Sequence, residues 1–246
     1  MLDDIFFEIH QNLSQEGSDR YIYTRKAFDI LPKIENPKIL DIGCGSGKQT
    51  IELVEISKGS IIGIDIHQTY LDELVKKAKE KRLENKITVL KKSMLNIDFP
   101  CGSFDIIWSE GSIYAVGFEK GLVDWKKFIK TGGFLVVHEM TWLKKDPPNE
   151  MKNYWEKMYP GITTIDKNLK IIKKCGYKIL DFFSLPEDFW WYEYYKPLED
   201  RLQTLRIKYK GDVKRMSTIE KEQGEIDLYK KYYQYFGSVF FIMQKA

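Results

Sequence analysis

The stretch that decides the fold is Lys38-Ile39-Leu40-Asp41-Ile42-Gly43-Cys44-Gly45-Ser46-Gly47-Lys48. A short apolar strand runs here into three glycines at alternate positions, and a helical pattern begins near Gln49. The backbone must turn sharply where strand becomes helix, which brings main-chain N–H groups close to a ligand. Glycine suits such a turn because it adopts positive φ and has no side chain to hold the ligand away. We therefore predict a ligand-binding strand-to-helix turn.

Three kinds of ligand-binding turn share this glycine-rich form, and the spacing separates them. A Walker-type phosphate loop is excluded, because Ile42 stands where its first glycine is needed and Gln49 where its hydroxyl is needed. A dinucleotide fingerprint needs a small third residue where Lys48 stands, which weakens that reading without excluding it. The third pattern, acidic-x-Gly-x-Gly-x-Gly, fits residues 41–47. A tight turn without a ligand also has these glycines, so the residues that follow must decide.

Composition bounds the class of protein. The 246 residues are 43% hydrophobic, which is enough for one elaborated domain with one full core. The 39 basic and 36 acidic side chains are interleaved, and this balance argues against a nucleic-acid partner. The three cysteines include no C-x-x-C pair, so the sequence predicts neither a disulfide framework nor a metal site. The acidic N-terminus and the lack of a long apolar run lead us to expect a soluble, cytoplasmic protein with no membrane partner.

Downstream segments alternate between strand and helix patterns. Strands are expected at 60–65, 86–90, 104–109, 134–139, 177–185 and 238–243, the last pairing with the sixth. Helices are expected at 4–13, 20–31, 49–57, 71–78, 118–129, 151–158 and 164–175. We expect Gln68 or Thr69 to cap the helix at 71–78, and the Gly132-Gly133 pair to close the helix at 118–129. An aromatic-rich helical insertion is expected at 187–235.

Asp65 ends the second strand about 20 residues after the glycine turn, where a carboxylate meets the ribose hydroxyls of an adenosine ligand. This architecture resembles the class I S-adenosylmethionine (SAM) dependent methyltransferases. The resemblance implies an α/β, Rossmann-like, doubly wound seven-stranded sheet with an antiparallel last strand pair. Residues 1–246 form a single domain in this scheme: an N-terminal helical cap (1–36), a SAM-binding core (37–143), and substrate-side helices with the last strands (144–246). The run 107–114 is similar to small bacterial methyltransferases of the quinone-biosynthesis type.

Around the methionine end of SAM, the resemblance implies contacts through the backbone of Gly43, Cys44 and Gly45. Asp41 would shape the turn and reach the amino group through water. Glu110, which follows the fourth strand, would bind the methionine ammonium or, equally, form a hydrogen bond to a lid.

Around the adenosine end, the resemblance implies that Asp65 binds both ribose hydroxyls, that Ile66 and Met94 sandwich the adenine, and that Ser93 touches its edge. A polarisable thioether packs well on an aromatic ring. The alternatives are a helix-capping role for Asp65 and an ordinary core position for Met94.

Catalysis needs a general base only if the acceptor is protonated. The candidates near the ends of the fourth and fifth strands are Glu110, Tyr114, His138 and Glu139, and none is assigned. His138 falls within an apolar strand, which favours a core histidine.

Aromatic residues gather in the segments expected around the acceptor. They either roof an acceptor pocket, pack the added helices or form a homodimer interface; they are Trp142, Trp155, Trp190, Trp191, Tyr194 and Tyr195. The predicted function is transfer of a methyl group from SAM to a small-molecule acceptor. The alternatives left open are an NAD-type oxidoreductase and a non-catalytic SAM-binding protein.

Overall fold

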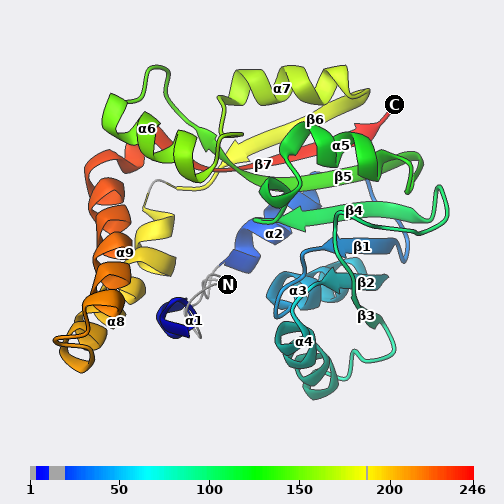
Figure 1. The fold of residues 1–246 in the computed structure, drawn as a ribbon. Helices are drawn as coiled ribbons and strands as arrows, with labels where there is room; N and C mark the ends of the chain where they lie inside the picture. The colour runs from blue at the N-terminus through cyan, green and yellow to red at the C-terminus, as the bar shows by residue number, and fades with distance from the viewer. Residues whose placement is uncertain (1–3, 11–19, 187) are drawn as a thin grey trace.

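A seven-stranded sheet organises the computed structural model, which describes residues 4–10, 20–186 and 188–246. The strand order is β3-β2-β1-β4-β5-β7-β6, with β1 to β5 parallel and β7 antiparallel to both of its neighbours (Figure 1). The strands are β1 (Lys38–Ile42), β2 (Ser60–Asp65), β3 (Ile87–Lys91), β4 (Phe104–Glu110), β5 (Ile129–Trp142), β6 (Tyr177–Ser184) and β7 (Phe236–Lys245). The predicted fold class is confirmed.

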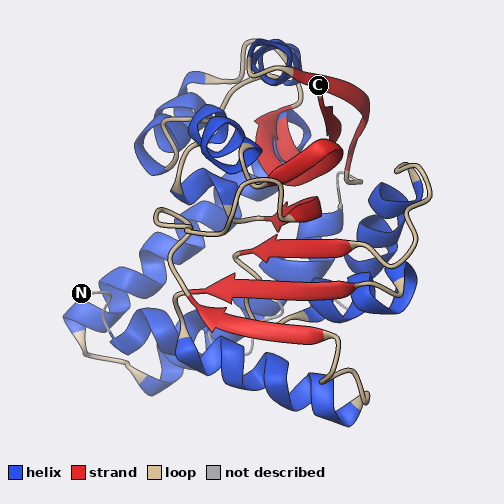
Figure 2. Cartoon of the chain, turned by 90° about the vertical axis from the view of Figure 1, so that its right-hand side faces the viewer, coloured by secondary structure: helices blue, strands red, loops and turns tan. Residues whose placement is uncertain are grey.

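Helices cover both faces of the sheet (Figure 2). Those described are α1 (Asp4–His10), α2 (Arg20–Asp29), α3 (Lys48–Ser57), α4 (Gln68–Glu80), α5 (Phe118–Lys126), α6 (Asn149–Met158), α7 (Ile165–Lys174), α8 (Lys196–Lys208) and α9 (Val213–Tyr232), with short turns η1 (Ile113–Ala115), η2 (Trp191–Tyr195) and η3 (Tyr233–Tyr235). None of the described helices is long and apolar enough to cross a membrane.

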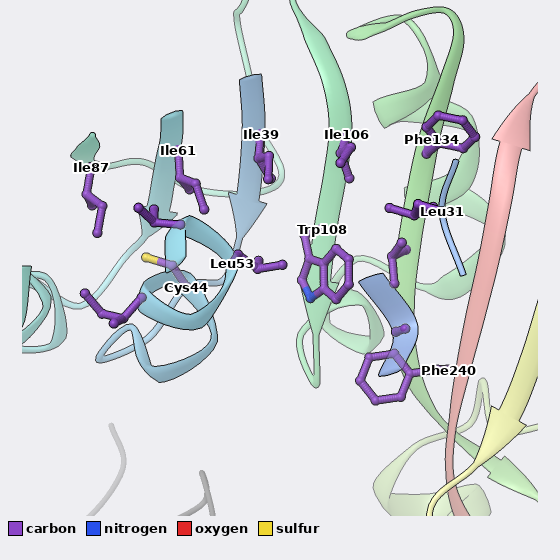
Figure 3. Close-up of a cluster of buried hydrophobic side chains, with 14 of the residues drawn as sticks. Leu31, Ile39, Cys44, Leu53, Ile61, Ile87, Ile106, Trp108, Phe134 and Phe240 are labelled. Atoms are coloured by element: carbon purple, nitrogen blue, oxygen red, sulfur yellow. The ribbon is translucent and has the colours of Figure 1, made fainter. Parts of the chain in front are cut away.

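Alternate residues of the strands supply two hydrophobic cores. On one face, Ile39, Ile106 and Trp108 pack with residues of α2, α3 and α4 (Figure 3). On the other face, Leu40 and Ile107 pack with residues of α5 and α7. Because both faces are buried, the central strands read as continuous apolar runs.

The sequence misplaced several boundaries. Helix α5 ends at Lys126, because β5 already begins at Ile129, and the Gly132-Gly133 pair lies inside that strand and closes no helix. The N-cap of α4 is His67, without a side-chain cap bond, so the prediction of Gln68 or Thr69 as cap was wrong. Helix α1 is described to His10, and residues 11–13 of the expected helix lie outside the described part of the chain.

The insertion between β6 and β7 builds a third core with α1. Residues of α1, α8 and α9 share one buried cluster with Trp142 at the end of β5. The insertion leaves and rejoins the sheet at one place, since the N–H of Leu185 donates to the carbonyl of Ser238 at 2.9 Å. These helices stand beyond the ends of β4 and β5 (Figure 1).

Candidate active site

The glycine turn has the backbone that the sequence predicts. Gly43, Gly45 and Gly47 have φ values of 75°, 53° and 83°. A Cβ on Gly43 would lie 2.4 Å from the Cβ of Ser112, and no side chain fits there. The turn therefore requires glycine for both its conformation and its close packing.

Three main-chain N–H groups of the turn are hydrogen-bonded within the protein. Those of Gly43 and Cys44 donate to the carbonyl of Ile64 at 2.9 and 3.1 Å, and that of Gly45 donates to Asp65 Oδ2 at 3.1 Å. The end of β2 therefore supplies the acceptors for these three N–H groups. The Cys44 side chain is buried in the core beside Gly63. Ligand contact by these residues stays a prediction.

Asp65 is positioned by the same bonds. Its Oδ2 accepts from Gly45, and its Oδ1 accepts from the N–H of His67 at 2.9 Å. The carboxylate is partly exposed, and each oxygen retains a further lone pair that a hydroxyl can use. The pair of oxygens fits the two hydroxyls of a ribose.

The loop after β3 reaches the turn through Met94. The Met94 Cε lies 3.5 Å from where a Cβ on Gly43 would stand. Ser93 Oγ accepts from the N–H of Leu95 at 3.2 Å, and Ile66 is 56% exposed. An exposed aliphatic side chain and a thioether beside the turn fit an adenine ring, although their contact with it stays a prediction.

Two predicted carboxylates are held by protein partners. Asp41 Oδ2 accepts from Thr50 Oγ1 at 2.6 Å, which fastens β1 to α3. Glu110 Oε1 accepts from Thr24 Oγ1 at 2.8 Å and from Trp108 Nε1 at 2.7 Å. Glu110 therefore ties the N-terminal helix α2 to β4, as the lid alternative predicts, while its contact with the methionine ammonium stays a prediction.

Ser112 is a site residue that the sequence did not single out. Its Oγ donates to the carbonyl of Ile42 at 2.7 Å and lies 2.7 Å from Ser109 Oγ. These bonds hold the loop after β4 against Gly43. The available signal was its place, two residues beyond the end of β4, where an open α/β sheet binds ligands.

The predicted bases occupy different environments. His138 is 1% exposed, and its ring centroid lies 4.8 Å from that of Phe240 and 6.3 Å from that of Trp190, which is the environment of a core histidine. Tyr114 is 56% exposed on η1, with its ring 6.0 Å from Tyr159. Tyr114 is therefore the more accessible of the two.

Glu139, near the end of β5, has a strongly perturbed carboxyl. Burial raises its pKa to about 8, against the lowering effects of the Met140 N–H and the Tyr159 hydroxyl. Oε1 accepts from Met140 at 2.7 Å, whereas Oε2 is buried without a hydrogen bond of standard geometry from the described residues. A carboxyl in this state is suited to proton transfer near neutral pH.

The raised pKa of Glu139 should make the protein less stable as the pH rises. Above about pH 4.5 the unfolded chain releases a proton that the folded chain keeps up to about pH 8. The free energy of unfolding should therefore fall across that window, by at most about 1.4 kcal/mol per pH unit. Urea unfolding at several pH values should show a shallower fall for Glu139→Gln. The exposed-carboxylate variant Glu150→Gln should keep the wild-type slope, and an unchanged slope in Glu139→Gln would contradict the assignment.

Comparison with known proteins agrees with this geometry. Residues 39–133 match the protein family described as "Methyltransferase domain". The sterol 24-C-methyltransferase of Debaryomyces hansenii is 28% identical over 141 residues, covering 57% of this chain and 37% of that protein. The enzyme of the same name from Candida albicans is 26% identical over 171 residues, covering 64% and 45%. The matches thus span less than half the length of these relatives.

Two solved structures share the fold. A SAM-dependent methyltransferase from Geobacter sulfurreducens, in complex with S-adenosyl-L-homocysteine (SAH), superposes with a TM-score of 0.80 at 14% identity, covering 100% of this chain and 99% of that one. The cyclopropane synthase MmaA2 from Mycobacterium tuberculosis gives 0.74 at 17% identity, covering 99% and 95%.

The fold is that of the class I SAM-dependent methyltransferases, and residues 39–133 match a methyltransferase domain. The cofactor of this class is S-adenosylmethionine. The finer resemblance to the quinone-biosynthesis type stays a prediction.

Proposed function

We propose that this chain transfers a methyl group from SAM to a small-molecule acceptor. One observation carries the proposal: Gly43, Met94 and Ser112 meet at the end of β1, with the Asp65 carboxylate bonded to the same turn. Strand β7 runs antiparallel to β5, whereas the dinucleotide-binding sheet is mostly parallel, which counts against the oxidoreductase alternative.

The residues at the turn supply binding and position. Asp65 would hold the ribose hydroxyls, and Ile66 with Met94 would hold the adenine. When bound, SAM supplies an activated methyl group on a sulfonium. The protein then has mainly to hold the acceptor atom in line with that methyl group, which by itself lowers the barrier substantially.

The acceptor side is formed by the aromatic helices. Trp142 and Tyr195 are buried within the chain, which supports the alternative that these aromatics pack the added helices. Sterols, which the relatives' names mention, are one class of small acceptor to test. We also propose that the protein is cytoplasmic and forms a homodimer.

Calorimetric titration with SAM and SAH tests donor binding. Incubation with methyl-labelled SAM and a metabolite extract then tests transfer. We expect binding of both compounds and label in at least one extract component. Absence of binding would refute the proposal, and binding without transfer to any extract would leave the non-catalytic alternative as the function.

A further inference from the structure

Two carboxyl groups of α9 lie close to polar side chains in the helices that form the third core. Glu225 of α9 accepts from Tyr154 Oη at 2.6 Å and from Tyr195 Oη at 3.2 Å. Its neighbour Glu222 is buried, with Oε2 3.4 Å from His10 Nε2. Desolvation raises the pKa of Glu225. Two acids are thus held within the third core.

A third acid reaches the same region from the sheet. Glu139 is 3% exposed, and its Oε2 lacks a hydrogen bond of standard geometry from the described residues, although the Tyr159 hydroxyl acts on its pKa. Buried polar atoms are almost always paired. The Tyr159 hydroxyl lies beside this carboxyl, so a ligand that donates a hydrogen bond here would meet the carboxyl and the tyrosine together.

Tyrosine rings connect the two sides. Tyr159 contacts Tyr114, whose hydroxyl acts electrostatically on that of Tyr194. The Tyr194 ring lies 5.1 Å from that of Tyr195, which bonds to Glu225. We call the set the acid–tyrosine cluster; its members are Tyr114, Glu139, Tyr159, Tyr194, Glu222 and Glu225.

The cluster also adjoins the donor site. Tyr114 is two residues beyond Ser112, which packs on Gly43 of the glycine turn. Strand β5 is bonded to the same loop, because the N–H of Gly111 donates to the carbonyl of His138, the residue before Glu139. The cluster is therefore connected to the glycine turn through the loop after β4.

The charge of the cluster selects among acceptors. The recorded polar partners of its three carboxyls are tyrosine hydroxyls, the Met140 N–H and His10, with no lysine or arginine among them in the described chain. A phosphate or diphosphate acceptor would meet acids without a compensating cation. An ammonium group would gain both the carboxylates and the faces of the tyrosine rings.

We propose that the methyl acceptor is an amine, bound in the acid–tyrosine cluster as its ammonium ion, with Glu139 receiving the proton. This inference rests on the proposed methyltransferase function. The ammonium gives one proton to the Glu139 carboxylate, and the freed nitrogen lone pair forms the new C–N bond. The bond between methyl carbon and sulfur breaks with its electron pair remaining on sulfur. The product is again an ammonium ion, and the proton on Glu139 passes to solvent.

Matched probes test this on the full chain saturated with SAH. Benzylamine, benzyl alcohol and benzyl phosphate share one skeleton and differ in head-group charge, and the same head groups on decyl chains cover a longer acceptor. We expect an amine to bind about tenfold or more tightly than its alcohol on at least one skeleton. Calorimetry in two buffers of different ionisation enthalpy should show release of up to about one proton, since an ammonium lowers the pKa of the acid it meets.

Variants locate the effect. Glu139→Gln and Glu225→Gln should lose most of the amine preference while still binding SAH, which shows that they fold. Glu150→Gln, an exposed carboxyl of α6, should behave as wild type. Equal or tighter binding of the alcohol or phosphate on both skeletons, no amine binding below about 10 mM, or preference unchanged in both variants would overturn the inference. Failure of the proposed function would appear earlier, as no binding of SAH.

Discussion

Asp65→Ala is expected to weaken SAH binding by about a hundredfold or more, because two hydrogen bonds to an ionised carboxylate are removed together. Asp65 also accepts from Gly45 and His67, so a loss of about 1 kcal/mol in unfolding free energy should accompany the change. Calorimetric titration measures the first effect and urea unfolding the second.

A ligand analogue separates the two contributions. The 2′-deoxy analogue of SAH lacks one of the hydroxyls, so wild-type protein should bind it about tenfold more weakly than SAH. Asp65→Ala should bind the two compounds alike. Asp98→Ala, which removes an exposed carboxylate bonded to Lys92, serves as control and should leave both affinities unchanged. A hydroxyl effect that persists in Asp65→Ala would show that another group binds the ribose.

Gly43→Ala should produce the largest combined loss of stability and binding. The residue has φ 75°, and the added methyl would lie 2.4 Å from the Cβ of Ser112. Backbone strain and overpacking together should cost about 3 kcal/mol. Binding of SAH should fall as well, because the turn must shift to admit the methyl group. Thermal unfolding and calorimetry measure the two losses.

A second substitution identifies the cause. In Gly43→Ala/Ser112→Gly the clash is relieved, but the φ strain remains and the Ser112 hydrogen bonds to Ile42 and Ser109 are lost, so only part of the lost stability should return. Gly224→Ala is the matched control, since nothing lies within 4 Å of a Cβ there and the residue is within α9. It should be neutral or stabilising by up to about 1 kcal/mol. Equal destabilisation by the two single alanine variants would contradict the packing argument.

The backbone of the glycine turn and the place of Asp65 beside it were predictable because their signals are local in sequence. Positive φ at three alternate positions strongly favours glycine, and β2 places Asp65 beside the turn at its end. The hydrogen bonds of the turn were not predictable, because the acceptor of two N–H groups is Ile64, on another strand.

The acceptor half depends on contacts between distant segments. Glu139 and Tyr159 are separated by the whole of α6, and Tyr194 meets His10, which is 184 residues away in the sequence. No period or motif in the sequence records such pairs. The sequence predicted that aromatic residues gather beyond β5, and only the fold shows which of them surround carboxyl groups.

The insertion between β6 and β7, which we propose carries much of the acceptor side, leaves and rejoins the sheet at one point and packs on α1 and Trp142. Leu185 and Ser238 are hydrogen-bonded neighbours, so the fifty or so residues between them begin and end at one point on the sheet. A short hairpin could join these two positions, but the residues of α1 and β5 that the insertion covers would then be exposed. If the proposed function holds, exchange of this segment for another that covers the same residues is a route by which the scaffold can acquire a different substrate range, in evolution or in the laboratory.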